Sequence, residues 1–192
     1  MYKIRNNEIE IISLFRKNYK TRFYLREISK LSKLPLRTCQ NTLRKLELSK
    51  ILKSKLEGKN KYFFLNLENI HTKHYLLQAE IHLTNFFLEK YSQFKIFLKS
   101  LNLTTPLFIF GSFAKLTTNK NSDMDLIVIA NKEPNFPFHL LPFKPHLFIM
   151  TEKAFCKAIK NQENLIKELE ENHIILNNHS FYVNVMWSHY GN

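Results

Sequence analysis

The sequence is poor in glycine and cysteine and has no long apolar run, and these shortages exclude several classes of protein. Its two cysteines, Cys39 and Cys156, lie far apart and neither belongs to a CxxC motif, which argues against a disulfide framework and against a zinc site. Its apolar runs are short and interrupted by Lys, Asn or Pro, whereas a membrane-spanning helix needs about 20 residues. The first residues also lack the apolar stretch of a signal peptide, so we expect a cytoplasmic protein that does not act at a membrane.

Positive charge is abundant, and most of it lies in the first third of the chain. Hydrophobic residues make up 44% of the sequence, which is enough for a folded core. Residues 1–70 hold 11 Lys and 6 Arg against 6 Glu, a net charge of +11, while residues 71–192 hold 12 Lys and no Arg against 10 acidic residues, a net charge of +2. An AT-rich genome inflates lysine everywhere but would not move every arginine to one end. We therefore expect the first third to bind nucleic acid.

The first 70 residues predict three helices followed by two short strands. Apolar spacing predicts helices over residues 7–18, Leu25–Leu31 and Leu36–Leu48. Two strands, Ile51–Leu56 and Lys61–Leu65, are expected to form a hairpin, with Gly58 in the turn because glycine tolerates positive φ. This order resembles a winged helix-turn-helix, in which Leu25–Leu48 would be the helix-turn-helix and the hairpin would be the wing.

The resemblance implies that the helix from Leu36 enters the major groove of double-stranded DNA. Its outward side chains would then be Arg37, Thr38, Gln40, Asn41, Arg44 and Lys45, with Thr42 also outward and Cys39, Leu43 and Leu46 inward. Arg, Gln and Asn suit bidentate contacts to bases. Phosphates would be contacted by Arg22 and Arg26 and by the wing lysines Lys53, Lys55, Lys59 and Lys61. The alternatives are a solvated lysine-rich surface and a protein–protein module.

The rest of the chain changes from a helical to a mixed pattern. Residues 71–100 carry apolar side chains at helical spacing and predict a connecting helix. Beyond them, the pattern predicts strands at Leu107–Phe110, Met124–Ala130 and Leu147–Met150, and helices at Thr151–Asn161 and Glu163–Glu171. We expect an α+β protein with a winged helix over residues 1–70, a connecting helix over 71–100, and a small mixed-sheet domain flanked by helices over 101–192.

Gly111-Ser112 follows a predicted strand and is the first candidate for phosphate binding. A glycine at a strand-to-helix turn lets the backbone approach a phosphate closely, and the N–H groups that follow attract the anion. The Ser112 hydroxyl can also bond to a phosphate oxygen. Because Gly111 is the only glycine between Gly58 and Gly191, its place between two apolar segments points to a specific use.

Asp123 and Asp125 begin a strand after a polar loop, Thr117–Ser122. Side chains at i and i+2 of a strand point to one face, so the two aspartates project together while Met124 and Leu126 face the other way. Neighbouring carboxylates repel each other unless a hard divalent cation lies between them, and Mg²⁺ with triphosphate oxygens is the usual solution. The alternative is a pair of loop acids.

Gly111-Ser112, ten further residues and then Asp-x-Asp at the start of a β-rich run resemble the nucleotidyltransferase (DNA polymerase β-like) superfamily in its minimal form. The resemblance covers roughly residues 101–190. It implies that Ser112 contacts the β and γ phosphates of a nucleoside triphosphate and that Asp123 and Asp125 hold Mg²⁺. A basic winged helix followed by such a domain also resembles a group of prokaryotic proteins described as transcriptional regulators.

Two positions depart from the family pattern. Lys115 matches a basic residue of the nucleotide-binding segment, but Leu116 replaces the glycine that often follows it. His146 stands where active members usually carry a third carboxylate on the next core strand. A histidine there is a general base, a softer metal ligand or a structural residue.

These features favour a DNA-binding regulator, dimeric on a two-fold site, whose second domain binds an NTP with Mg²⁺. It would transfer a nucleotide, AMP being favoured, to a hydroxyl acceptor. One alternative is a nucleotide-sensing transcription factor without turnover. Others are an antitoxin-type enzyme that modifies a partner protein and an enzyme that acts on RNA ends.

Overall fold

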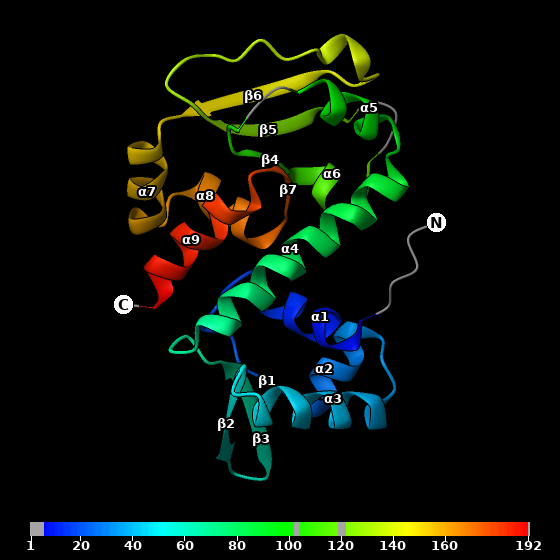
Figure 1. Ribbon diagram of the computed structural model, residues 1–192, viewed down its shortest axis with the longest axis vertical. Helices are drawn as coiled ribbons and strands as arrows, with labels where there is room; N and C mark the ends of the chain where they lie inside the picture. Colours follow the sequence, from blue (N-terminus) through cyan, green and yellow to red (C-terminus); the bar gives the residue numbers. More distant parts are fainter. Residues whose placement is uncertain (1–5, 102–103, 119–121, 192) are drawn as a thin grey trace. The chain divides into compact units, whose positions relative to one another are not determined.

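Figure 1 shows the computed structural model, which describes residues 6–101, 104–118 and 122–191. Four short segments of the predicted domains and of the polar loop lie outside the described residues. They are residues 1–5, 102–103, 119–121 and 192. Contacts divide the chain into two compact units: an N-terminal unit, up to His82 and again from Met186, and a C-terminal unit, Leu83–Val185. Each unit combines helices with one small sheet, which confirms the predicted α+β class.

The N-terminal unit begins with α1 (Asn7–Ile12), whose first N–H groups are capped by the Asn6 side chain. The helix predicted over residues 7–18 is shorter than expected, since a 3₁₀ turn (Ser13–Phe15) follows α1. Asn18 then reverses the chain, because its side chain accepts from the Lys20 N–H and its carbonyl accepts from the Thr21 N–H. A local turn that satisfies two donors is strong enough to end a helical pattern.

Two further helices, α2 (Leu25–Ser32) and α3 (Leu36–Leu48), confirm the predicted pair. The inner side of α3 carries Cys39, Leu43 and Leu46 as expected. Thr42 was expected to face outward, but it is buried and its hydroxyl donates to the Thr38 carbonyl at 2.9 Å. Position 42 lies one turn from 39 and 46, so helical periodicity places it on the buried side, and the back-bond satisfies the hydroxyl there.

The predicted hairpin is present as β2 (Leu52–Glu57) and β3 (Asn60–Leu65), and Leu52 pairs with Leu65. A third strand, β1 (Phe23–Tyr24), joins the free edge of β3 and completes a three-stranded antiparallel sheet in the order β1-β3-β2. With only two residues, β1 is too short to show the alternation from which strands are recognised in sequence.

The segment 71–100 forms two helices, α4 (Ile70–Lys90) and α5 (Gln93–Ser100), where a single connecting helix was expected. The boundary between the units falls within α4, and its first half packs in the N-terminal unit. There Glu80 accepts from the buried Arg16 guanidinium at 2.9–3.1 Å, and Tyr75 donates to Glu8 at 2.8 Å. None of the described helices is both long and apolar enough to cross a membrane.

The C-terminal unit contains a four-stranded mixed sheet in the order β6-β5-β4-β7. Its strands are β4 (Leu107–Phe110), β5 (Met124–Ile129), β6 (Pro145–Met150) and β7 (His173–Asn177). β5 and β6 run parallel, whereas β4 is antiparallel to both β5 and β7. The three predicted strands are confirmed as β4, β5 and β6, whereas β7 was not predicted as a strand, and the mixed sheet matches the expected architecture.

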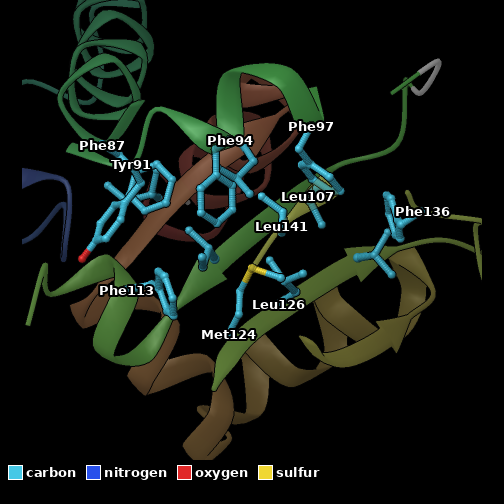
Figure 2. Packing of buried hydrophobic residues seen from close by; sticks show 14 residues of the cluster. Phe87, Tyr91, Phe94, Phe97, Leu107, Phe113, Met124, Leu126, Phe136 and Leu141 are labelled. Atoms are coloured by element: carbon cyan, nitrogen blue, oxygen red, sulfur yellow. The ribbon is translucent and has the colours of Figure 1, made fainter. Parts of the chain in front are cut away.

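Aromatic rings cover one face of this sheet. The rings pack over strand residues such as Leu126 (Figure 2). They belong to Phe87 in the second half of α4, to Tyr91 directly after α4, and to Phe94 and Phe97 of α5. Successive strand residues alternate between faces, so the residues between these core positions point to the opposite side.

Three helices lie on the side of the other face: α7 (Glu152–Asn161), α8 (Asn164–Glu171) and α9 (His179–Tyr190). Phe108 of β4 stacks on Phe155 of α7, with ring centroids 5.8 Å apart, and contacts Tyr182 of α9. Thr151 caps α7 by accepting from the Ala154 N–H.

Candidate functional site

Three strands place candidate side chains at one edge of the C-terminal sheet. β4 ends at Phe110, and β5 and β6 begin at Met124 and Pro145, which pair with each other. A short helix, α6 (Gly111–Ala114), follows β4 directly. The Gly-Ser turn, the aspartates and the start of β6 therefore meet at this edge, although up to 35 positions separate them in the sequence.

Gly111 lies against the carboxylate of Asp125. Its φ is +65°, a conformation that side chains rarely adopt. A Cβ atom added at this position would lie 2.7 Å from Oδ2 of Asp125, which is closer than any van der Waals contact. Two separate constraints thus favour glycine here, the positive φ and the close approach of the backbone to Asp125.

The helix α6 ends in a left-handed residue at Leu116, with φ +57°. The Thr117 N–H donates to the Ser112 carbonyl and the Leu116 N–H to the Phe113 carbonyl, which is the Schellman pattern. Glycine is the usual residue at such a left-handed position, and the resemblance described above also led us to expect glycine here. Leu116 therefore adopts a conformation that glycine adopts more easily.

Asp123 and Asp125 stand at the start of β5, on the opposite face from the aromatic core. Met124 and Leu126 are fully buried in that core, whereas Asp123 is exposed and Asp125 is half-buried. The expected alternation is thus present. The sequence contains 16 acidic residues, of which only these two are aspartates, so the short carboxylate side chain is confined to this one site.

His146 is the partner of Asp125 in the parallel pairing of β5 with β6. Its Nδ1 lies 3.2 Å from Oδ1 of Asp125, and the two side chains share one face of the sheet. The imidazole ring also contacts the Phe148 ring, with centroids 4.4 Å apart. The position predicted for a third carboxylate is therefore beside Asp125, and it holds an imidazole.

The two remaining candidates lie on and just after α6. Ser112 is half-buried in the first turn of that helix, next to Gly111. Lys115 is exposed and is the C-cap residue, so its long side chain extends into solvent from the same short element.

A metal ion bound at Asp123 and Asp125 would have few protein ligands. Among the residues that the structure describes, no group of three or more His, Cys, Asp and Glu side chains is arranged to hold a metal. Mg²⁺ commonly binds through one or two carboxylates and completes its shell with water and substrate phosphates. The pair Asp123 and Asp125, with open backbone at Gly111 beside it, fits this open kind of site and does not fit an enclosed one.

Glu170 is a buried carboxylate that sequence reasoning missed. It is 8% exposed, lies on the inner side of α8 with Ile166 and Leu169, and its Oε1 has no hydrogen-bond partner among the described residues. Burial raises the pKa of its carboxyl group. The burial of Glu170 could have been inferred from its position in the sequence alone. It lies four residues after Ile166 and therefore on the apolar side of the helix.

The N-terminal unit has a groove of about 820 Å³ between α2, α3 and the hairpin. Five of the residues predicted to bind DNA line it: Arg26, Gln40, Arg44, Lys59 and Lys61. Glu47 also lines the groove, where it accepts from the ammonium of Lys61 at 2.8 Å and from the Ser54 hydroxyl. Burial by itself would raise the pKa of Glu47, but these two hydrogen bonds outweigh burial and lower it.

The other predicted DNA-binding residues are placed differently. On α3, Arg37, Asn41 and Lys45 are exposed and Thr38 is half-buried, but none of them lines the groove. Arg22 lines a second hollow instead, together with Lys20 and Lys53, and pairs with Glu57 at 2.6 Å. The structure therefore brings five of the twelve predicted residues together in one groove, and Arg22 is not among them.

Comparison with known proteins concerns the C-terminal part of the chain. Searches of curated proteins and of solved structures found no significant match. Residues 91–179 match the family described as Nucleotidyltransferase domain. This segment includes β4, α6, β5, β6 and β7, and with them Gly111, Asp125 and His146. By this match, the chain carries a segment similar to the nucleotidyltransferase domain, and the mixed sheet of its C-terminal unit fits that family.

Proposed function

We propose that the C-terminal unit binds a nucleoside triphosphate with Mg²⁺ at Gly111-Ser112 and Asp123/Asp125 and transfers a nucleotide to a hydroxyl acceptor. The observation that carries this proposal is the contact between Gly111 and Asp125. A backbone kept free of side chains beside a carboxylate suits a site where a phosphate and a cation must approach together. The nucleotidyltransferase match over the same residues supports it.

In the proposed reaction, each residue of the site has a positioning or electrostatic task. The Ser112 hydroxyl donates to a phosphate oxygen, and Lys115 places a positive charge near the triphosphate. Asp123 and Asp125 would hold Mg²⁺, which when bound neutralises charge that develops on the phosphates. The acceptor oxygen forms a bond to the α-phosphorus, the bond from that phosphorus to the bridging oxygen breaks, pyrophosphate leaves, and the hydroxyl proton goes to solvent. We favour ATP as donor and AMP as the transferred group.

Pyrophosphate release is the direct test of turnover. The full chain would be incubated with ATP, CTP, GTP or UTP and Mg²⁺, with and without candidate hydroxyl acceptors. We expect release that is lost in Asp123→Asn/Asp125→Asn, a pair of substitutions that keeps side-chain size and removes charge. Glu133→Gln is the matched control, since it neutralises an exposed carboxylate outside the site. Tight NTP binding without release in any condition would instead indicate a nucleotide sensor.

A second proposed function is the binding of double-stranded DNA by the N-terminal unit as a winged helix. Its support is the groove in which Arg26, Arg44 and Lys61 converge from a helix start, a second helix and a hairpin. Cations from three elements around one groove suit the phosphates of a duplex, and Gln40 beside them suits a base edge. A regulator that couples this binding to nucleotide binding, dimeric on a two-fold site, is the function we favour for the whole chain.

Salt dependence tests the DNA proposal. Duplex binding by the full chain, measured by fluorescence anisotropy, should weaken steeply between 50 and 200 mM salt, since phosphate contacts release counterions. Arg44→Ala should lower the affinity about tenfold, the effect of losing one good base or phosphate contact. Lys17→Ala removes an exposed cation outside the groove and should change little. Preference for single-stranded or transfer RNA would favour an RNA-end enzyme, and labelling of a co-expressed partner protein would favour an antitoxin-type enzyme.

A further inference from the structure

We infer that Arg44 and Glu47 of α3 read a guanine and a cytosine of neighbouring base pairs in the major groove of double-stranded DNA. The inference rests on the proposed DNA binding by the N-terminal unit, since it concerns the same groove. It goes further by naming the bases and by separating the side chains that select them from those that hold phosphates. Glu47 was not among the residues predicted from the sequence to contact DNA.

The first support is the position of Glu47 on the same side of α3 as two residues predicted to contact DNA. Gln40, Arg44 and Glu47 follow each other at intervals of four and three residues, so helical periodicity places them in one row. All three line the groove of the N-terminal unit. Three residues of a helix rise about 4.5 Å, and successive base pairs of a duplex are about 3.4 Å apart. Arg44 and Glu47 are therefore spaced to reach neighbouring base pairs.

The second support is that the hairpin fixes the carboxylate of Glu47 at the wall of the groove. Oε2 of Glu47 accepts from the Lys61 ammonium at 2.8 Å, and Oε1 accepts from the Ser54 hydroxyl. Burial by itself would raise the pKa of Glu47, but these hydrogen bonds lower it, so the carboxylate is ionised at neutral pH. The side chain is 33% exposed, and each carboxylate oxygen can accept a second hydrogen bond. A base edge can therefore reach it.

The third support is the chemistry of the base edges, because a carboxylate only accepts hydrogen bonds. In the major groove, guanine and thymine present acceptors, which repel a carboxylate. Adenine presents its amino group beside the acceptor N7, whereas cytosine presents its N4 amino group alone. A fixed carboxylate therefore favours cytosine. Arg44 has the complementary preference, because two guanidinium N–H groups can donate to O6 and N7 of guanine.

The cations around the groove divide into free and engaged groups. In the part of the chain that the structure describes, the exposed guanidinium of Arg44 forms no salt bridge or hydrogen bond, which leaves it available to a base. Arg26 at the start of α2 and Lys59 in the hairpin turn are also free of salt bridges among these residues. Lys61, by contrast, is engaged by the carboxylate that it orients. Arg26 and Lys59 flank the row on α3 from two other elements, and this placement suits the phosphates on either side of a base step.

A competing interpretation is that Glu47 only fastens the hairpin to α3. In that case Glu47→Gln would lower the affinity for all duplexes alike and would leave the base preference unchanged. Base preference therefore separates the two roles, because a loss of packing does not distinguish one base from another. Glu57→Gln is the matched control, since Glu57 is a carboxylate of the same hairpin that pairs with Arg22 and does not line the groove.

Selection from a pool of duplexes with a randomised central segment provides the readout. The full chain would be mixed with the pool at low salt, and the retained duplexes would be sequenced. We expect wild type and Glu57→Gln to enrich a guanine and a cytosine on neighbouring base pairs, each about tenfold over the other bases. Glu47→Gln should lose the preference for cytosine and keep that for guanine, and Arg44→Ala should show the reverse.

Modified bases give a second measurement that needs only the wild-type protein. In the selected duplex, N4-methylcytosine places a methyl group on the amino group that Glu47 would contact, and 7-deazaguanine removes the N7 acceptor that Arg44 would contact. Each modification should weaken wild-type binding about tenfold, the usual effect of losing one good base contact. The methyl group on cytosine should have little effect on Glu47→Gln. This measurement decides the question even if Glu47→Gln does not fold.

Two outcomes overturn this inference while leaving the proposed DNA binding intact. One is a wild-type protein that retains duplexes without a preference for cytosine, or whose preference persists in Glu47→Gln. The other is undiminished binding of wild type to the duplex that carries N4-methylcytosine. If wild type retains no duplex from the pool at low salt, the proposed DNA binding itself is wrong, and the inference fails with it.

Discussion

In the N-terminal unit, most carboxylates pair with a lysine or an arginine, and among the described residues of the C-terminal unit neither aspartate does. Arg16 and Glu80 are buried and share three hydrogen bonds, and Lys61 reaches Glu47 at the groove. Among the described residues, Asp123 has no salt bridge, and Asp125 has a hydrogen bond with the His146 imidazole at 3.2 Å. The first arrangement stabilises a fold, while the second keeps negative charge available at a sheet edge.

The largest expected effect concerns the buried Arg16–Glu80 pair of the N-terminal unit. Glu80→Ala leaves Arg16 buried without its carboxylate and should destabilise the N-terminal unit by about 3–5 kcal/mol. Thermal unfolding followed by the fluorescence of Trp187, the only tryptophan and a residue of that unit, measures it. Glu68→Ala, which removes the exposed partner of Lys53, is the control and should cost less than about 1 kcal/mol. Equal effects would show that the buried pair contributes no more than a surface pair.

The substitution Gly111→Ala tests the proposed nucleotide-binding site of the C-terminal unit. The new methyl group would meet Oδ2 of Asp125 at 2.7 Å, and alanine at a φ of +65° is strained. We expect NTP binding with a divalent cation to fall on the order of 100-fold, with a stability loss of about 1–3 kcal/mol. Calorimetric NTP binding and thermal unfolding, measured together, separate the two. Gly58→Ala is the control, because it has a similar φ but open space around it. Undiminished NTP binding in Gly111→Ala would place the nucleotide elsewhere.

Glu170→Gln asks whether an unpaired carboxyl inside the C-terminal unit is costly. Since burial raises the pKa of Glu170 in the folded protein, the folded state prefers the neutral acid. Stability from this group is complete below the unfolded pKa, near 4.5, and is lost as pH rises through the folded value.

Glutamine cannot ionise, so it should stabilise the protein by about 1–3 kcal/mol at pH 8 and by much less at pH 4. Denaturant unfolding of both proteins at the two pH values measures this difference. Glu168→Gln on the exposed side of the same helix is the control. An equal change at pH 4 and pH 8 would show that ionisation of Glu170 is not the cause.

The smallest effect concerns the turn after α6. Leu116→Gly should stabilise the C-terminal unit by about 0.5–1 kcal/mol, because glycine adopts the left-handed conformation without strain. Leu116→Ala keeps that strain and should not stabilise. Chemical denaturation of the three proteins distinguishes them. A destabilised Leu116→Gly would mean that the packing of the leucine side chain outweighs the backbone strain.

Local patterns predicted the elements more reliably than their ends. Strand β5 was recognisable because polar and apolar residues alternate at its start, and α3 because apolar residues recur at helical spacing. The 3₁₀ turn after α1 and the two-residue β1 were missed, since each depends on a turn or on a partner strand distant in sequence. The break between α4 and α5 has no glycine or proline to signal it.

The sequence by itself determined the division of charge and the joint projection of Asp123 and Asp125, because composition and strand alternation are local properties. It also singled out Gly111 and His146. Only the tertiary structure decided that Gly111 abuts the Asp125 carboxylate, that His146 Nδ1 lies 3.2 Å from it, and that Arg26, Arg44 and Lys61 share a groove while Arg22 does not. The burial of Glu170 was decided in the same way. These relations depend on pairing and packing between distant segments, and no local periodicity encodes which strand lies beside which.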